Sequence, residues 1–524
     1  MFTLALVLSV LGLVLGPGLL RIGRGHVRMT AAIDGFTIGA VPALIASRLA
    51  PHLVAELGPR ALVFLAIGYV GYLAVEARTH GKAAPIGVMI VVPLLVVHSF
   101  LDGAGLAAAF AGAATSSSSG ILGCALVLHK VPEGLFVATV LVPRLGFASA
   151  MSRIGLLALA TVGGALGGRE LLSYAPDVVL HASVAVGLGV MLRLVVHRHG
   201  AKSASSEDRA IAAIGFVVAV AGSLLLPSPE DILGRSQPNE LPVAHTLIPL
   251  FVETALGVLI GLVATALARA LLAASRSRSW RSIDVGPFVF AAFCLGPRFA
   301  AMTGATVLCL TVVTHAAARA RDAPPIDERP ITERLADELR LTFGRRLDAI
   351  VPPYVVALLI TAVVEAATPR DVLASVTGWV QVLACLAAGL LVGPTKTYGA
   401  VILAAVVLHK GGSPAAAVAF VLVGLTLTGV RDVWSARGRL AGLAMATVSA
   451  IVIVIASVSA RALAPLEARQ DLHGLVTHAH AAHEWLGACV VAGLLLRSLV
   501  RRGPRDWFGA LVVEPDASAS VTAP

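Results

Sequence analysis

The segment ALVLHKVPEGLFVATVLV, residues 125–142, decides both the fold and the candidate function. It is apolar enough to cross a bilayer, yet His129, Lys130 and Glu133 stand near its centre. On an insertion scale each charged side chain at mid-membrane costs roughly 2.5–3.5 kcal/mol, whereas each Leu or Val contributes only about 0.3–0.6 kcal/mol. These three side chains are therefore expected to face protein, water or an ion, and not lipid.

The composition of the whole chain is typical of a membrane protein with many spans. Of its 524 residues 57% are hydrophobic and 13% are charged, and the mean hydropathy is +0.88. The net charge of +10 comes from short basic clusters between apolar runs, which is the pattern of cytoplasmic loops and not of a nucleic-acid-binding face. We predict an all-α, polytopic integral membrane protein with about seventeen transmembrane helices in two helical-bundle modules.

The charge pattern also predicts the topology. The first eight spans are expected to begin near residues 3, 31, 61, 86, 120, 151, 177 and 209. Positive charges follow the first apolar run and do not precede it, so this run is predicted to be a retained span and not a cleaved signal peptide. The expected location is the cell membrane, with the N-terminus outside and the C-terminus in the cytoplasm.

Breaks in hydropathy divide the chain into four predicted regions. These are a first membrane module at 1–227, an outer linker at 228–242, a second membrane module at 243–500 and a disordered cytoplasmic tail at 501–524. Within the second module, 319–346 is expected to form an amphipathic helix on the cytoplasmic surface. Later spans are predicted at 349–365, 371–392, 397–409, 414–429, 440–463 and 485–500. All five cysteines lie in apolar segments without a CxxC pair, so they are predicted to be reduced.

Two motifs place metal-ligating residue types inside predicted spans. In VVHSFLDGAGLAAAF, residues 96–110, His98 and Asp102 are four residues apart, and His129 and Glu133 repeat this spacing in the next span. Residues four apart share one face of a helix, so two neighbouring spans can offer two imidazoles and two carboxylates to one point. Such donors suit zinc, and also iron, manganese or cobalt. The metal would be a substrate, and no prosthetic group is expected.

On these motifs the first 227 residues resemble the ZIP family of metal transporters, whose fourth and fifth helices carry motifs of the HNxxD/E and HNxPEG kind. HSFLDG and HKVPEG stand at these places here. The resemblance implies an eight-helix fold with a binuclear metal site between helices 4 and 5. It also implies that His98, Asp102, His129 and Glu133 are metal ligands and that Ser99 is a second-site ligand.

Two residues depart from the family pattern. Lys130 stands where relatives have Asn, Asp or Glu, and Thr161 stands where many have a glutamate in the sixth span. A protonated amine cannot bind a metal, so we hypothesise that the Lys130 ammonium replaces the second metal and leaves a single site. The alternative is a His–Asp and Lys–Glu network that joins helices or relays protons.

The second module carries a fainter pattern. KGGSPAAAVAF, residues 410–420, is similar to an element of the permease family that includes arsenical exporters and proposed metal-efflux permeases, although the cysteine motif for arsenic is missing. The side chains that could attract an anion or oxyanion here are Lys396, Tyr398, His409 and Lys410. Alternatively, Lys396 follows the charge rule and His409 lies at the outer interface. Glu253 and Glu365 lie near span ends, where we expect solvated side chains.

A histidine-rich stretch, DLHGLVTHAHAAHEW at 471–485, is predicted to lie outside the membrane. Its His478, His480 and His483, with the adjacent Glu484, could form a weak surface metal site, or the stretch could be an ordinary interfacial loop.

The function predicted from these patterns is membrane transport of a divalent transition-metal cation, zinc above all, between helices 4 and 5. The alternative is a permease that works through the second half, with the first half a structural or regulatory metal-binding module. The chain contains no HExxH sequence and no nucleophile constellation, so an enzyme is not expected. Expected partners are the bilayer and the metal ion, with a homodimer as an open alternative and no nucleic acid.

Overall fold

The computed structural model describes residues 2–23, 26–58, 60–78, 83–111, 127, 130–172, 177–196, 205–225, 243–273, 284–318, 328–368, 372–376, 378–392, 398–462 and 480–509. No strand occurs in this part of the chain, so the described fold is all-helical, as predicted. Seven of its helices are long and apolar enough to cross a membrane, and further apolar helices have 10–17 residues. These helices indicate a membrane-embedded protein.

Contacts between Cα atoms divide the chain into two compact units. Unit 1 comprises Met1–Ala244 with the short segments Ala366–Thr368 and Leu499–Val512, and unit 2 comprises most of the remainder from His245 onward. The predicted linker at 228–242 lies outside the described residues.

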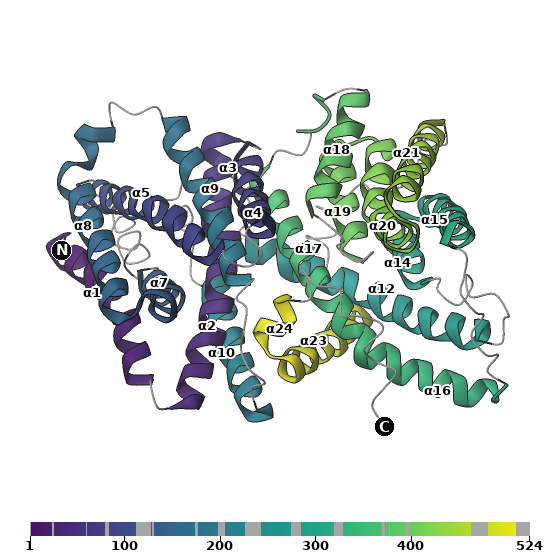
Figure 1. The fold of residues 1–524 in the computed structure, drawn as a ribbon, viewed down its shortest axis with the longest axis horizontal. Coiled ribbons are helices and arrows are strands. Elements are labelled where there is room, and N and C mark those ends of the chain that lie inside the picture. The colour runs from purple at the N-terminus through teal and green to yellow at the C-terminus, as the bar shows by residue number, and fades with distance from the viewer. Residues whose placement is uncertain are drawn as a thin grey trace. The chain divides into compact units, whose positions relative to one another are not determined.

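Seven helices of unit 1 begin within four residues of a predicted span start, whereas α7 begins ten residues after the predicted start at 120, and no span was predicted for α3 or α24. The described helices are α1 (Phe2–Gly23), α2 (Val27–Leu44), α3 (Ala50–Leu57), α4 (Arg60–Arg78), α5 (Ala83–Ala111), α7 (Lys130–Leu145), α8 (Phe147–Leu172), α9 (Asp177–Val196), α10 (Ser206–Leu225) and α24 (Pro504–Gly509). The main packing pairs are α2 with α10, α5 with α8, α4 with α9 and α1 with α7 (Figure 1). Because α8 packs against both α5 and α7, it fixes the two helices that carry the HSFLDG and HKVPEG motifs.

Glycines allow these helices to approach closely. A Cβ atom added at Gly164 of α8 would lie 1.9 Å from the carbonyl oxygen of Phe100 on α5, and one at Gly103 would lie 2.0 Å from the carbonyl oxygen of Thr161. On the other side, a Cβ at Gly134 of α7 would lie 2.3 Å from the carbonyl oxygen of Leu13 on α1. Each of these distances is far below van der Waals contact, so only glycine fits.

This packing leads to a stability prediction. Replacing Gly164 by alanine is expected to destabilise the protein by about 1–3 kcal/mol, because the methyl group must push α8 away from α5. Gly155, on the same helix, provides the matched control, since nothing lies within 4 Å of a Cβ placed there. In thermal unfolding in detergent, Gly155→Ala should equal or exceed the parent, and equal melting of the two variants would contradict the packing described here.

The helix α24 closes unit 1 with an ion pair and an aromatic cluster. The Arg505 guanidinium pairs with the carboxylate of Asp34 on α2. The rings of Trp507 and Phe508 lie 6.0 and 5.6 Å from the ring of Phe216 on α10. Part of the predicted disordered tail at 501–524 is therefore ordered, because its aromatic side chains are buried in unit 1; Trp507 is 3% and Phe508 4% exposed.

Unit 2 is also a helical bundle. Its helices are α12 (Val243–Leu272), α14 (Gly286–Leu295), α15 (Pro297–Ala318), α16 (Ile331–Leu341), α17 (Leu347–Ala367), α18 (Trp379–Val392), α19 (Tyr398–His409), α20 (Pro414–Arg437), α21 (Arg439–Ala462) and α23 (Ala482–Arg502). The helix α20 packs against α21, α18 and α15 (Figure 1).

Two elements of unit 2 differ from the prediction. The predicted surface helix at 319–346 and the predicted span at 349–365 are not separated by a loop. The amphipathic helix α16, which has no buried residue, continues through a π-helical turn at Thr342–Arg346 into α17. The predicted span at 371–392 begins only at Trp379, because the backbone N–H of Leu373 donates to the carbonyl of Lys410 and Gly378 adopts a φ of 66°. The helix α18 therefore has only 14 residues, and the neighbouring α19 has 12.

Candidate functional site

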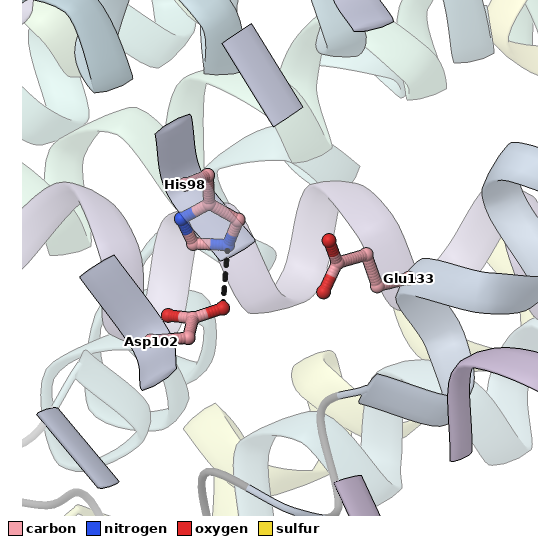
Figure 2. Close-up of side chains that lie close together, drawn as sticks. All are labelled: His98, Asp102 and Glu133. Carbon is pink, nitrogen blue, oxygen red and sulfur yellow. Dashed lines mark ion pairs between the residues drawn. The ribbon is translucent and has the colours of Figure 1, made fainter. Parts of the chain in front are cut away.

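A polar cluster occupies the interior of unit 1 where α5 faces the start of α7. On α5, His98 and Asp102 are one helical turn apart, and His98 Nε2 lies 3.4 Å from Asp102 Oδ2. Glu133, in the first turn of α7, faces this pair (Figure 2). One ligand atom from each of these three residues lies within 4.8 Å of the other two. The two sequence motifs therefore meet at one point.

The Lys130 ammonium lies at the centre of this cluster. Its Nζ is 2.7 Å from Asp102 Oδ2 and 2.6 Å from Glu133 Oε2. It also donates a 3.3 Å hydrogen bond to the Ser99 hydroxyl, which in turn donates to Glu133 Oε1 at 2.8 Å. The Lys130 ammonium thus bridges the two carboxylates, at the position that a metal ion bound to both of them would take.

The cluster is removed from water. Lys130 is 1% exposed, Glu133 7%, His98 8% and Ser99 0%, and the Asp102 side chain is 12% exposed. Two carboxylates and one ammonium carry a net charge of −1 when His98 is neutral. Because an unpaired charge is costly in such surroundings, the arrangement stabilises the ions chiefly by pairing them with one another.

Not every predicted ligand of this cluster can be placed. His129 lies outside the described residues, so its role as a ligand stays a prediction. Thr161 is 1% exposed, and its hydroxyl donates to the carbonyl of Leu157 in its own helix at 3.0 Å. Its hydroxyl therefore has a local partner.

The predicted anion site of the second half does not converge in space. Tyr398 and His409 are the first and last residues of α19, about 16 Å apart along a helix of 12 residues. Lys396 lies outside the described residues. Tyr398 is buried beside Gly286, whereas His409 pairs with a carboxylate at the other end of the helix. No single ion could contact both Tyr398 and His409, whereas the predicted Lys410 lies with His409 around the same carboxylate.

A buried ion network that was not predicted occupies the end of α19. Glu365 Oε1 lies 3.0 Å from His409 Nε2, and its Oε2 lies 3.2 Å from Lys410 Nζ. The expectation that Glu365 is solvated is wrong, because its side chain is only 13% exposed. The non-helical segment before α18 is held in place by Gln381. Its amide nitrogen donates to the carbonyl of Leu373, and its amide oxygen accepts from the backbone N–H of Ser413. In the sequence, the signal for this network was the pair of basic residues His409 and Lys410 at the end of a predicted span.

The histidine-rich stretch is only partly described. His478 lies outside the described residues, and His483 is exposed on α23. His480 lies against Glu484, with Nδ1 3.3 Å from Oε2. Glu253 of α12 completes a group of three whose ligand atoms lie within 4.8 Å of one another. The expectation that Glu253 is solvated is wrong, since it is 7% exposed.

The described cysteines agree with the reduced state predicted from sequence. Cys294, Cys309, Cys385 and Cys489 are free thiols, and Cys124 lies outside the described residues. The groups of candidate metal ligands in the described residues contain only imidazole nitrogens and carboxylate oxygens, which suit zinc and its first-row neighbours.

No family model, no curated protein and no solved structure matches this chain.

Proposed function

We propose that this protein transports a divalent transition-metal cation, with Zn²⁺ as the preferred substrate, through the cluster between α5 and α7. The observation that carries the proposal is the convergence of His98, Asp102 and Glu133 within 4.8 Å among apolar helices. One imidazole and two carboxylates are a donor set that zinc accepts, and His129 is the proposed fourth ligand. In a membrane interior such ionisable groups mark ion pathways more often than they serve as structural elements.

The proposed architecture follows the resemblance described above. About seventeen spans form a ZIP-like eight-helix module at 1–227 and a permease-like module at 243–500, with the N-terminus outside and the C-terminus in the cytoplasm. The helix starts of unit 1 and its glycine-mediated packing support this arrangement. The sequence contains no P-loop, so transport would be driven by ion gradients.

In this proposal Lys130 acts as a built-in cation in place of a second metal ion. Its ammonium bridges Asp102 and Glu133 at 2.7 and 2.6 Å. When zinc enters from the His98 side, repulsion between the zinc ion and the ammonium weakens the ion pairs of the ammonium with the two carboxylates. When zinc leaves, the ammonium pairs with both carboxylates again. The empty carrier therefore never buries two bare carboxylates while its helices rearrange.

A transport assay on the full-length protein tests the proposal. In proteoliposomes, His98→Ala is expected to lose zinc uptake and to lower the zinc content of the purified protein, because the site loses its described nitrogen ligand. His26→Ala is the control, since His26 is exposed at the start of α2. Zinc uptake by His98→Ala at the parental rate would contradict the proposal.

A second candidate function places transport in unit 2. The buried network of Glu365, His409 and Lys410, next to the short helices α18 and α19, favours it. Discontinuous helices with ionisable side chains line substrate sites in many transporters. The same liposome assay separates the two proposals. If Glu365→Gln abolishes zinc uptake while His98→Ala leaves it intact, unit 2 carries the transport and the α5–α7 cluster is structural or regulatory.

A further inference from the structure

A second group of metal-ligating side chains lies in unit 2, away from the proposed transport cluster. Glu253 projects from α12, Glu484 from the first turn of α23, and His480 immediately precedes that helix. One ligand atom of each lies within 4.8 Å of the other two. Residues 253 and 480–484 are far apart in the sequence, so the group is created by the fold and not by a local motif.

The helices α12 and α23 are in contact beside this group. A Cβ atom added at Gly487 of α23 would lie 3.4 Å from the Cα of Leu256 on α12, which is ordinary van der Waals contact. Glu484 precedes Gly487 by three residues, and Glu253 precedes Leu256 by three, so both carboxylates lie one turn before the contact. The backbone N–H of Ala481 donates to Glu484 Oε2 at 2.9 Å and holds that side chain toward the start of its helix.

The electrostatics of this group favour a cation. Glu253 is 7% exposed, and the side chains of His480 and Glu484 are 8% and 18% exposed. Two carboxylates at this separation repel each other where water is scarce, and a divalent cation between them would reduce this repulsion. The imidazole nitrogen and the carboxylate oxygens of this group are ligands for zinc, which holds such atoms at about 2.0–2.2 Å.

The distances become compatible with zinc when the side chains draw together. Ligand atoms about 2.0–2.2 Å from a tetrahedral zinc ion lie about 3.3–3.6 Å apart. A pair at the 4.8 Å limit must therefore close by about 1.2–1.5 Å. The His480 and Glu484 side chains lie in the first turn of α23 or just before it, where a rotamer change requires no shift of the helix axis. Because the Glu484 side chain is partly exposed, an ion can reach the group from solvent, and a water molecule can supply the remaining ligand.

We propose that Glu253, His480 and Glu484 form a Zn²⁺ site that ties the start of α23 to α12. This site shares His480 and Glu484 with the surface site predicted from the sequence, but its third ligand is the buried Glu253 from another helix in place of His478 and His483. It does not rest on the proposed transport function, which concerns unit 1. Zinc held here would stabilise unit 2 and would not pass through it.

The test measures zinc binding by the full-length protein in nanodiscs, after chelator treatment and gel filtration. Glu253→Gln and His480→Ala are each expected to bind one zinc equivalent fewer than the parent. His483→Ala is the matched control, because His483 is exposed one residue before Glu484, and it should bind as much as the parent. His98→Ala reports separately on the cluster in unit 1.

Tryptophan fluorescence gives a second readout. The Trp485 ring meets the His480 ring edge-on at 6.0 Å between centroids, so zinc on the imidazole should change Trp485 emission. The change, taken as the difference from Trp485→Phe, should occur in the parent and in His483→Ala and be absent in Glu253→Gln. Should His480→Ala fail to fold, His480→Gln carries the same expectation. Parental stoichiometry in Glu253→Gln, or loss of one equivalent in His483→Ala, would overturn the proposal.

Discussion

Replacing Lys130 by methionine is expected to destabilise the metal-free protein by about 3–5 kcal/mol, because the substitution leaves two buried carboxylates without their shared cation. In the parent, the Lys130 ammonium lies 2.7 Å from Asp102 and 2.6 Å from Glu133, and the side chain is 1% exposed. Methionine has a similar length and no charge, so the loss of packing is small and the electrostatic effect dominates. Thermal or urea unfolding of the chelator-treated protein in detergent measures it.

Zinc should reverse much of this loss. A divalent cation can take the place of the ammonium between the carboxylates, and zinc at a hundredfold excess over its dissociation constant would contribute about 2.7 kcal/mol. The double variant Lys130→Met/Glu133→Gln is the control, because removal of one carboxylate also removes most of the repulsion. If metal-free Lys130→Met is as stable as the parent, the ammonium does not have the compensating role described here.

Replacing Glu133 by glutamine is expected to reduce zinc uptake in proteoliposomes to the level of empty vesicles. With Lys130 still charged, the substitution changes the cluster from a net charge of −1 to neutral, so a divalent cation would enter a buried site without compensation. Glutamine keeps the volume and can still accept the hydrogen bond from Ser99, which at present joins Glu133 Oε1 at 2.8 Å. The defect should therefore appear in zinc transport and not in the yield of folded protein.

Glu207→Gln is the matched control for this measurement. Glu207 belongs to the same unit, and its carboxylate pairs with Arg28 at 2.6 Å, but its side chain is 60% exposed. An exposed ion pair contributes little, so transport by this variant should equal that of the parent. Zinc uptake by Glu133→Gln at half the parental rate or more would contradict transport through this cluster.

The sequence carries strong information on local features of this protein. The spacing of His98 and Asp102 predicts their shared helix face, since four residues make about one turn, and the two side chains do meet. The charge of Lys130 inside an apolar run predicts a buried partner, because lipid cannot solvate an ammonium, and the partners are the carboxylates of the same two motifs. Helix positions follow from hydropathy in the same way.

Contacts between distant segments could not be predicted. Glu253 and Glu365 look like ordinary residues near the ends of spans, and nothing around them in the chain indicates burial. The side chains around them come from elsewhere in the sequence: Lys410 is 45 residues from Glu365, and His480 and Glu484, which lie near Glu253, are more than 200 residues from it. Helix packing decides these pairings, and one sequence does not contain that geometry. The delayed start of α18 has the same origin, because Leu373 bonds to the backbone of Lys410.

The attachment of α24 to α2 and α10 has a consequence for biosynthesis. Domains generally fold as units while the ribosome is still adding residues, and the earliest segments fold first. Here Asp34, near the beginning of the chain, acquires its partner Arg505 only after more than 450 further residues have been translated. The first bundle therefore gains this ion pair and the aromatic cluster of Trp507 and Phe508 only when the last part of the sequence has been synthesised.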